Sequence, residues 1–197
     1  MSTVQKTTVS GRSKTLRRFS DLAALGEVVF HDRDLAALWG ITDMNLLHTT
    51  LSRYVHRGLL RRIWRGMYAI KPLEEIDPLL LGIKALHSQA YVGTETILFR
   101  AGIINQRPYA TTLVSSISRR FSIGDHVYIS RKLDDAYLYQ DIGISKKNGV
   151  REASPERAVA DLLYFNPKAH FDRPIDWTAV RDIQQTLGYP LTPKRYR

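Results

Sequence analysis

Residues 57–70 read RGLLRRIWRGMYAI, an apolar stretch that is interrupted by four arginines and turned at Arg65-Gly66. Residues 61–64 and 67–70 can pair as strands, because Gly66 readily takes the positive φ of a tight connection. A two-stranded ribbon is only marginally stable alone, so this hairpin needs apolar contacts with other elements. The stretch therefore predicts a hairpin that displays arginines.

The sequence before the hairpin predicts three helices. Residues 15–25 carry apolar side chains at helical spacing and stop at Gly26, and a second short helix opens with Asp32 as its cap and ends at Gly40. The third helix starts at Thr42 or Asp43 and continues to about residue 57. Three helices followed by a basic hairpin are the order of a winged helix-turn-helix.

The third helix has two unlike faces. At 100° per residue its inward side holds Met44, Leu47, Leu51, Tyr54 and Val55. Its outward side holds Asn45, Thr49, Ser52, Arg53 and His56. A polar face without carboxylates can offer donors and acceptors to base edges without repelling phosphates. The alternative interpretation is an ordinary solvated helix face.

The net charge of +10 and a pI near 9.9 favour nucleic acid or an anionic surface as partner. Residues 1–71 hold 12 Lys and Arg against 5 Asp and Glu, a net charge of +7, so most of the excess lies in the first third. The segment 71–78 changes sign and has a proline near each end. We expect a basic leader at 1–14, whose order the sequence leaves open, a DNA-binding domain at 15–71 and a second domain at 79–197.

The second half predicts an α+β domain with an antiparallel sheet. Helices are expected at 79–89, at 94–101 with Thr94 as cap, and from Ser154-Pro155-Glu156 onward. The β-rich segments 111–117, 126–133 and 137–145 indicate an antiparallel meander. Further basic side chains, Arg119, Arg120, Lys146 and Lys147, are expected at strand ends or loops, where they are candidates for added phosphate contacts.

Three motifs in order resemble the AbiEi antitoxins, partners of nucleotidyltransferase toxins in abortive-infection (type IV) toxin-antitoxin operons. They are the run from Val28 to Ile70, TETILFRAGI at 94–103 and SPERAVADLLY at 154–164. The resemblance covers roughly residues 17–175 and implies a two-domain repressor of its own operon that binds inverted repeats in promoter DNA. It also implies that the toxin is countered without a stable complex being required, and two half-sites favour a dimer on DNA.

Nine side chains are the candidate DNA contacts. Base edges would be reached by Asn45, His48, Thr49 and Arg53, wing contacts would come from Arg61, Arg62 and Arg65, and backbone phosphates would be touched by Arg17 and Arg18. Two rival functions remain open: a protein-interaction antitoxin that binds its toxin directly, and a stand-alone winged-helix regulator.

Other classes of protein have little support in the sequence. The chain has no cysteine and six histidines without zinc-ligand spacing, so no metal site and no cofactor are expected. No Glu-x-Lys, Gly-rich phosphate loop or Gly-x-Ser-x-Gly elbow occurs, and carboxylates such as Asp125, Asp134 and Asp141 lie near predicted turns. We therefore expect no catalytic residues, and, without a signal peptide or membrane span, a cytoplasmic protein.

Overall fold

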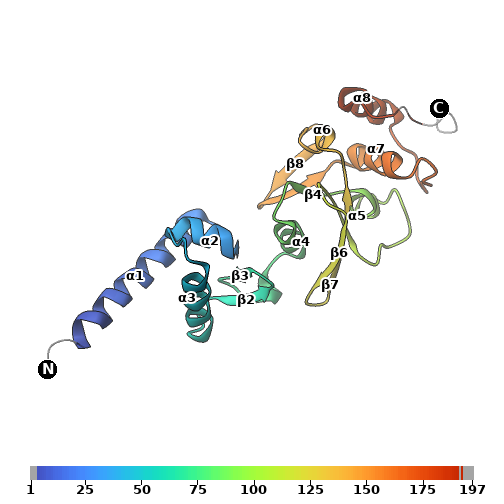
Figure 1. Cartoon of the computed structure of the whole chain (residues 1–197). Helices are drawn as coiled ribbons and strands as arrows, with labels where there is room; N and C mark the ends of the chain where they lie inside the picture. The colour runs from blue at the N-terminus through green and yellow to red at the C-terminus, as the bar shows by residue number, and fades with distance from the viewer. Residues whose placement is uncertain (1–3, 191, 193–197) are drawn as a thin grey trace. The chain divides into compact units, whose positions relative to one another are not determined.

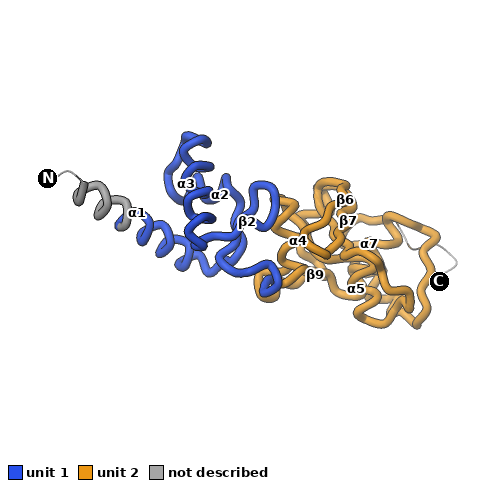
Figure 2. The backbone as a smooth tube through the Cα atoms, turned by 90° about the horizontal axis from the view of Figure 1, so that it is seen from below, with its two compact units in different colours: residues 1–76 blue, residues 77–197 orange. Residues whose placement is uncertain are grey.

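The computed structural model describes residues 4–190 and 192, with side chains from residue 13 onward. The chain forms two compact units, Met1–Ile76 and Asp77–Arg197, coloured separately in Figure 2. Among the described residues, no helix combines the length and apolar character needed to cross a membrane. Each unit is described by itself below.

The first unit is a winged helix-turn-helix (Figure 1). Its helices and strands are α1 (Val4–Leu25), β1 (Val29–His31), α2 (Asp32–Trp39), α3 (Met44–His56), β2 (Arg61–Trp64) and β3 (Met67–Ala69), followed by the 3-10 turn η1 (Leu73–Glu75). The strands form one antiparallel sheet in the order β1-β3-β2. The predicted fold class is confirmed.

One hydrophobic cluster joins the three helices to the sheet. Its buried members are Leu22, Phe30, Leu35, Ile41, Leu47, Leu51, Tyr54, Leu60 and Tyr68. All three helices contribute, as do β1, β3 and Leu60 directly before β2, so the helices and the sheet bury apolar side chains in the same core.

The turn between α2 and α3 follows from Gly40. This glycine adopts φ 62°, which lets Ile41 N–H donate to the Ala36 carbonyl at 2.9 Å and close the helix. Ile41 then turns into the core at 8% exposure. Asp43 caps α3 by accepting a hydrogen bond from Asn45 N–H at 2.8 Å, which fixes the start of that helix.

Several sequence expectations for this unit were wrong in detail. The first helix begins at Val4 rather than at residue 15, so its backbone takes in most of the expected leader; residues 1–3 lie outside the described part. Asp32 is the first residue of α2, not its cap. Met44 is 38% exposed rather than inward, because it starts its helix at the rim of the core. The hairpin also gains a third strand, β1, which supplies the support that two strands lack.

The second unit is a six-stranded mixed sheet with helices against it (Figure 1). Its elements are α4 (Pro78–Leu86), β4 (Ala90–Val92), α5 (Thr94–Arg100), β5 (Thr111–Ser115), β6 (Arg119–Ile123), β7 (His126–Lys132), α6 (Asp135–Leu138), β8 (Ile144–Lys147), β9 (Val150–Ala153), α7 (Pro155–Phe165) and α8 (Trp177–Leu187). The strand order is β6-β7-β5-β4-β9-β8. Helix α4 packs closely on it, since a side chain at Gly82 would meet the Tyr128 ring at 2.5 Å.

The α+β class of this unit is confirmed, but the antiparallel meander was wrong. Strand β7 lies parallel to β5, and β4 lies parallel to β9. Side-chain hydroxyls join the parallel strands β5 and β7: Ser115 and Ser130 are hydrogen-bonded to each other at 2.7 Å. Ser130 also donates to the Ile117 carbonyl, in the segment that leaves β5, at 2.9 Å. Strand β6 and helix α8 were missed, and Gly93, not Thr94, takes the cap position of α5.

A buried arginine explains why residues 137–145 do not form a strand throughout. Arg157, at 0% exposure, donates to the carbonyls of Ile142 at 2.9 Å and of Gln140 and Tyr137 at 3.3 Å each. These carbonyls are therefore satisfied by a side chain rather than by a neighbouring strand. Asp134 starts the single turn of α6 by accepting from Ala136 N–H at 2.9 Å.

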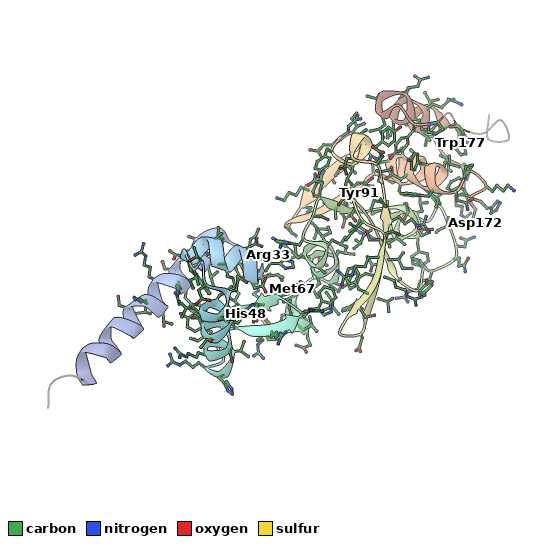
Figure 3. All side chains as sticks on the ribbon, viewed as in Figure 1. Arg33, His48, Met67, Tyr91, Asp172 and Trp177 are labelled. Atoms are coloured by element: carbon green, nitrogen blue, oxygen red, sulfur yellow. The ribbon has the colours of Figure 1, made fainter. Side chains whose placement is uncertain are left out.

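The same arginine is the centre of a polar core. Its Nε donates to Asp161 at 2.9 Å, one turn along α7, and that carboxylate also accepts from Tyr91 at 2.8 Å and Tyr189 at 2.7 Å (Tyr91 is labelled in Figure 3). Burial, and then the Asp161 carboxylate, raise the pKa of both tyrosines above the ordinary value. Both hydroxyls therefore stay protonated as donors, and the network links β4, α7 and the segment after α8.

Candidate nucleic-acid interface

The outward face of α3 presents the four predicted base-reading side chains. Asn45, His48, Thr49 and Arg53 are all exposed, while Leu47 on the opposite face is buried. The 3.6-residue period of the helix produces this division, since the core takes every third or fourth side chain. The helix carries no carboxylate of its own, and its only nearby cap acid is Asp43 at the N-terminus.

Thr49 and Asn45 are linked along this face. The Thr49 hydroxyl donates to the Asn45 carbonyl at 2.8 Å, so its proton is used within the helix. The hydroxyl oxygen can still accept a hydrogen bond, and the methyl group remains available for apolar contact. Asn45 keeps both ends of its side-chain amide available, since its backbone N–H rather than its side chain meets the cap.

His48 lies at the edge of the face beside an acid from another helix. Its Nε2 is 3.6 Å from Oδ2 of Asp32, with 55% of the histidine and 24% of the aspartate side chain exposed (His48 is labelled in Figure 3). The absence of acid predicted for this face thus holds for α3 itself, but Asp32 of α2 borders it. A phosphate close to Asp32 would be repelled by its carboxylate.

The wing is also hydrogen-bonded to Asp32. Asp32 N–H donates to the Gly66 carbonyl at 2.9 Å, and a side chain at Gly66 would lie 3.3 Å from the Asp32 carboxylate. Gly66 also has φ +70°, the left-handed conformation that the tight turn needs. The wing tip, with exposed Arg65, is therefore fixed against the start of α2.

The two arginines of β2 are exposed on opposite faces of the strand, because side chains alternate. Arg62 pairs with Tyr68, so both side chains lie on the face of the sheet that meets the helical core. Burial raises the pKa of Tyr68, the Arg62 guanidinium opposes that rise and Asp32 adds to it, which agrees with this placement. Arg61 points to the other face, so Arg61 and Arg62 do not reach a ligand from the same side of the sheet.

The neighbouring arginines Arg17 and Arg18 of α1 differ in their surroundings. Arg17 is exposed, as a phosphate contact requires. Arg18 is half-buried; its Nη1 donates to the Tyr54 hydroxyl at 3.2 Å and its guanidinium lies 5.2 Å from the centre of the Trp39 ring. Arg18 therefore joins α1 to α2 and α3, a structural use that the sequence did not indicate.

Sequence reasoning missed an apolar side chain on the proposed reading face. Leu46 is 53% exposed and lies between Asn45 and the buried Leu47, near the exposed Met44. The signal was present, because at 100° per residue Leu46 projects among the polar residues rather than with the core. An exposed leucine at the start of such a helix can contact the methyl group of thymine.

Two of the carboxylates that were considered for catalysis, and Asp161 in addition, have structural roles. Asp134 caps α6, Asp141 pairs with Arg151, and Asp161 belongs to the buried arginine network. Among the described residues, no group of three His, Asp, Glu or Cys side chains could hold a metal ion.

The comparison with known proteins concerns the first unit, which carries the proposed DNA face. Residues 17–71 match the family model described as transcriptional regulator, AbiEi antitoxin, which confirms the predicted resemblance for the N-terminal domain. A solved structure titled RV2827C protein from Mycobacterium tuberculosis aligns with 89% of this chain and 67% of its own, at 13% identity and a TM-score of 0.45. That likeness is too weak to support an argument about function. No curated protein matches the sequence significantly.

Proposed function

We propose that this protein is a sequence-specific DNA-binding repressor that acts as the antitoxin of an AbiE-type pair. The observation that carries the proposal is the exposed, acid-free face of α3 beside a wing of exposed arginines, within a domain that matches a family of antitoxin regulators. In this proposal α3 enters the major groove, and Asn45 and Arg53 contact base edges there. The wing arginines contact phosphates or the adjacent minor groove.

Leu46 and Thr49 extend the proposed contact surface with apolar atoms. Leu46 is 53% exposed, and the Thr49 methyl group stands beside it on the same face. Thymine is the base that presents a methyl group in the major groove. We therefore infer an operator in which a thymine lies opposite the first turn of α3.

His48 takes a narrower role than the other three side chains. Its imidazole faces the Asp32 carboxylate at 3.6 Å, so contact with a base would compete with this pair. We assign to His48 a contact at the rim of the groove, and to Arg17 a contact with backbone phosphate. Arg18 is assigned to the fold of the domain first, because its guanidinium already meets Tyr54 and Trp39.

The partner assignments rest on the family resemblance. We propose that the cognate nucleotidyltransferase toxin is countered in the same cytoplasm, and that two copies of the chain bind the two halves of an inverted repeat. A stable stoichiometric complex with the toxin that survives high salt would instead favour the direct-binding antitoxin. A sedimentation measurement with promoter DNA gives the number of copies per operator.

The test is a salt titration of a fragment of the protein's own promoter, followed by fluorescence anisotropy. Each phosphate contact contributes about 0.9 to the slope of log affinity against log salt, so removing Arg62 and Arg65 should lower the slope by about 1.8, and Arg61, on the other face of the strand, should add little. The variant carries Arg61→Ala, Arg62→Ala and Arg65→Ala. A slope near zero for the unmodified protein would refute DNA binding of this kind.

A matched control separates local contacts from total charge. Lys132, Lys168 and Arg173 are exposed basic residues of the second unit, and their triple substitution by alanine removes the same three charges. The slope should then change much less than with the wing variant. Equal changes for both triple variants would reduce the binding to a general charge effect and remove the wing from the proposal.

A further inference from the structure

The second unit contains a cavity of about 370 Å³ that is separate from the proposed DNA face. It lies where the parallel strands β5 and β7 begin, beside the last turn of α5. Its lining includes Phe99, Arg100, Arg107, Tyr109, Asp125 and His126. The volume is within the usual range of small-molecule sites, about 300–1,000 Å³.

Two aromatic side chains of this cavity face water. Tyr109 is 70% exposed and Phe99 is 36% exposed, although both line a concave site. The Arg120 guanidinium lies 5.2 Å from the centre of the Tyr109 ring and restrains it from the side of β6. An exposed ring that is held in place by a cation is a stacking surface for another planar group, and nucleobases stack on such rings.

The cations of the cavity can receive an anion. Arg107 is exposed and makes no hydrogen bond or ion pair with any residue that the structure describes. Arg100 donates through Nη1 to Glu152 at 3.0 Å, with 51% of its side chain exposed, so the other N–H groups of the guanidinium stay available. Guanidinium groups bind phosphate in pairs of charge-assisted hydrogen bonds, so two arginines on one cavity favour a phosphorylated ligand.

A ligand that carries only anionic groups does not match the whole cavity, because the lining also includes the carboxylate of Asp125. It is an exposed carboxylate on the lining, and it accepts hydrogen bonds while repelling further negative charge. The hydroxyl groups of ribose and the amino groups of bases are donors that suit such an acceptor. An acidic peptide would satisfy the arginines, but it would leave both Asp125 and the aromatic rings without a use.

We propose that this cavity binds a nucleotide, with the base stacked on Tyr109, the phosphate held by Arg107 and Arg100, and a ribose or base donor bound by Asp125. Free nucleotides and the 5′-phosphorylated end of a single strand share this chemistry. The site belongs wholly to the second unit and does not depend on the DNA contacts proposed for α3 and the wing.

The test is isothermal titration calorimetry of the full chain with ATP and, separately, with a 5′-phosphorylated tetraribonucleotide of adenosine. Arg107→Ala and Tyr109→Ala should each weaken binding by about tenfold, since one stacked base or one charged contact has that size. The matched controls are Arg173→Ala and Tyr139→Ala, which remove an exposed arginine and a 61% exposed tyrosine outside the cavity. Both controls should stay within about twofold of the unmodified protein.

Two results would overturn the proposal: no binding of either probe at millimolar concentration, or equal weakening by the cavity variants and their controls. Tighter binding of ATP assigns the site to free nucleotides, and tighter binding of the tetramer assigns it to strand ends. Promoter affinity of the Arg107→Ala and Tyr109→Ala variants should equal that of the unmodified protein. If the unmodified protein bound ATP but did not bind promoter DNA, only the repressor proposal would be refuted.

Discussion

The arginines of the proposed DNA face in the first unit and the buried Arg157 of the second unit have opposite surroundings. In the first unit Arg53, Arg62 and Arg65 stand in water on α3 and the wing. In the second unit Arg157 is fully buried and its donors are used by Asp161, Tyr91 and backbone carbonyls. A guanidinium whose donors are satisfied inside the fold stabilises that fold, whereas one that keeps its donors in water is available to a ligand.

The largest expected effect belongs to the buried arginine. Arg157→Leu leaves Asp161 without its cation at 0% exposure, so the second unit should lose about 3–5 kcal/mol of unfolding free energy. Hydrogen exchange, resolved at the level of peptides by mass spectrometry, would detect faster amide exchange in α7 and residues 137–145. The control Arg173→Leu, at an exposed position, should leave exchange unchanged. If Arg157→Leu exchanged like the control, the buried network would not stabilise the unit.

The next effect separates the contacts that recognise bases from the contacts that bind the DNA backbone. Arg53→Ala should lower affinity for the operator by about 1–3 kcal/mol and hardly affect unrelated DNA, so base preference relaxes. Arg65→Ala should weaken all sequences more evenly and flatten the salt slope by about 0.9. Both residues are exposed, so the melting temperature should stay unchanged. Identical losses on every sequence would remove α3 from the role of recognition helix.

Arg18 is the intermediate case: its substitution should lower the unfolding free energy, as that of Arg157 does, but by a smaller amount. Its hydrogen bond to Tyr54 and its position on Trp39 predict a loss of about 1–2 kcal/mol of unfolding free energy for Arg18→Ala. Arg17→Ala, its exposed neighbour, should leave stability unchanged and reduce only the salt slope. Chemical denaturation of both variants measures the difference. A stability loss for Arg17→Ala equal to that of Arg18→Ala would contradict the assignment.

The smallest effect tests the alternation along β2. Arg62 shares the face of Tyr68, next to the helices, whereas Arg61 points to the other face. Arg62→Ala should therefore reduce promoter affinity by about 1 kcal/mol more than Arg61→Ala, a single charge-assisted contact. Anisotropy titrations at one salt concentration suffice, since the two variants have the same net charge. A larger loss for Arg61→Ala would reverse the orientation assigned to the wing.

The sequence by itself determined two turns and the inward face of one helix in the first unit. Gly40 and Gly66 could be recognised because only glycine takes a positive φ easily, and the apolar period of residues 47–54 fixed the inward face of α3. The match to a family model over residues 17–71 agrees with this local character. Each of these features depends on residues close together in the chain.

Only the tertiary structure decided what depends on distant partners. Nothing near Arg157 in the sequence indicates that its donors bond the carbonyls of Tyr137, Gln140 and Ile142, nor that Tyr91 and Tyr189 meet at Asp161. The same holds for Asp32, whose carboxylate reaches His48 and whose backbone holds the wing tip. Buried polar groups must find hydrogen-bond partners, and those partners come from whichever segments the fold brings together, so local periodicity carries no record of them.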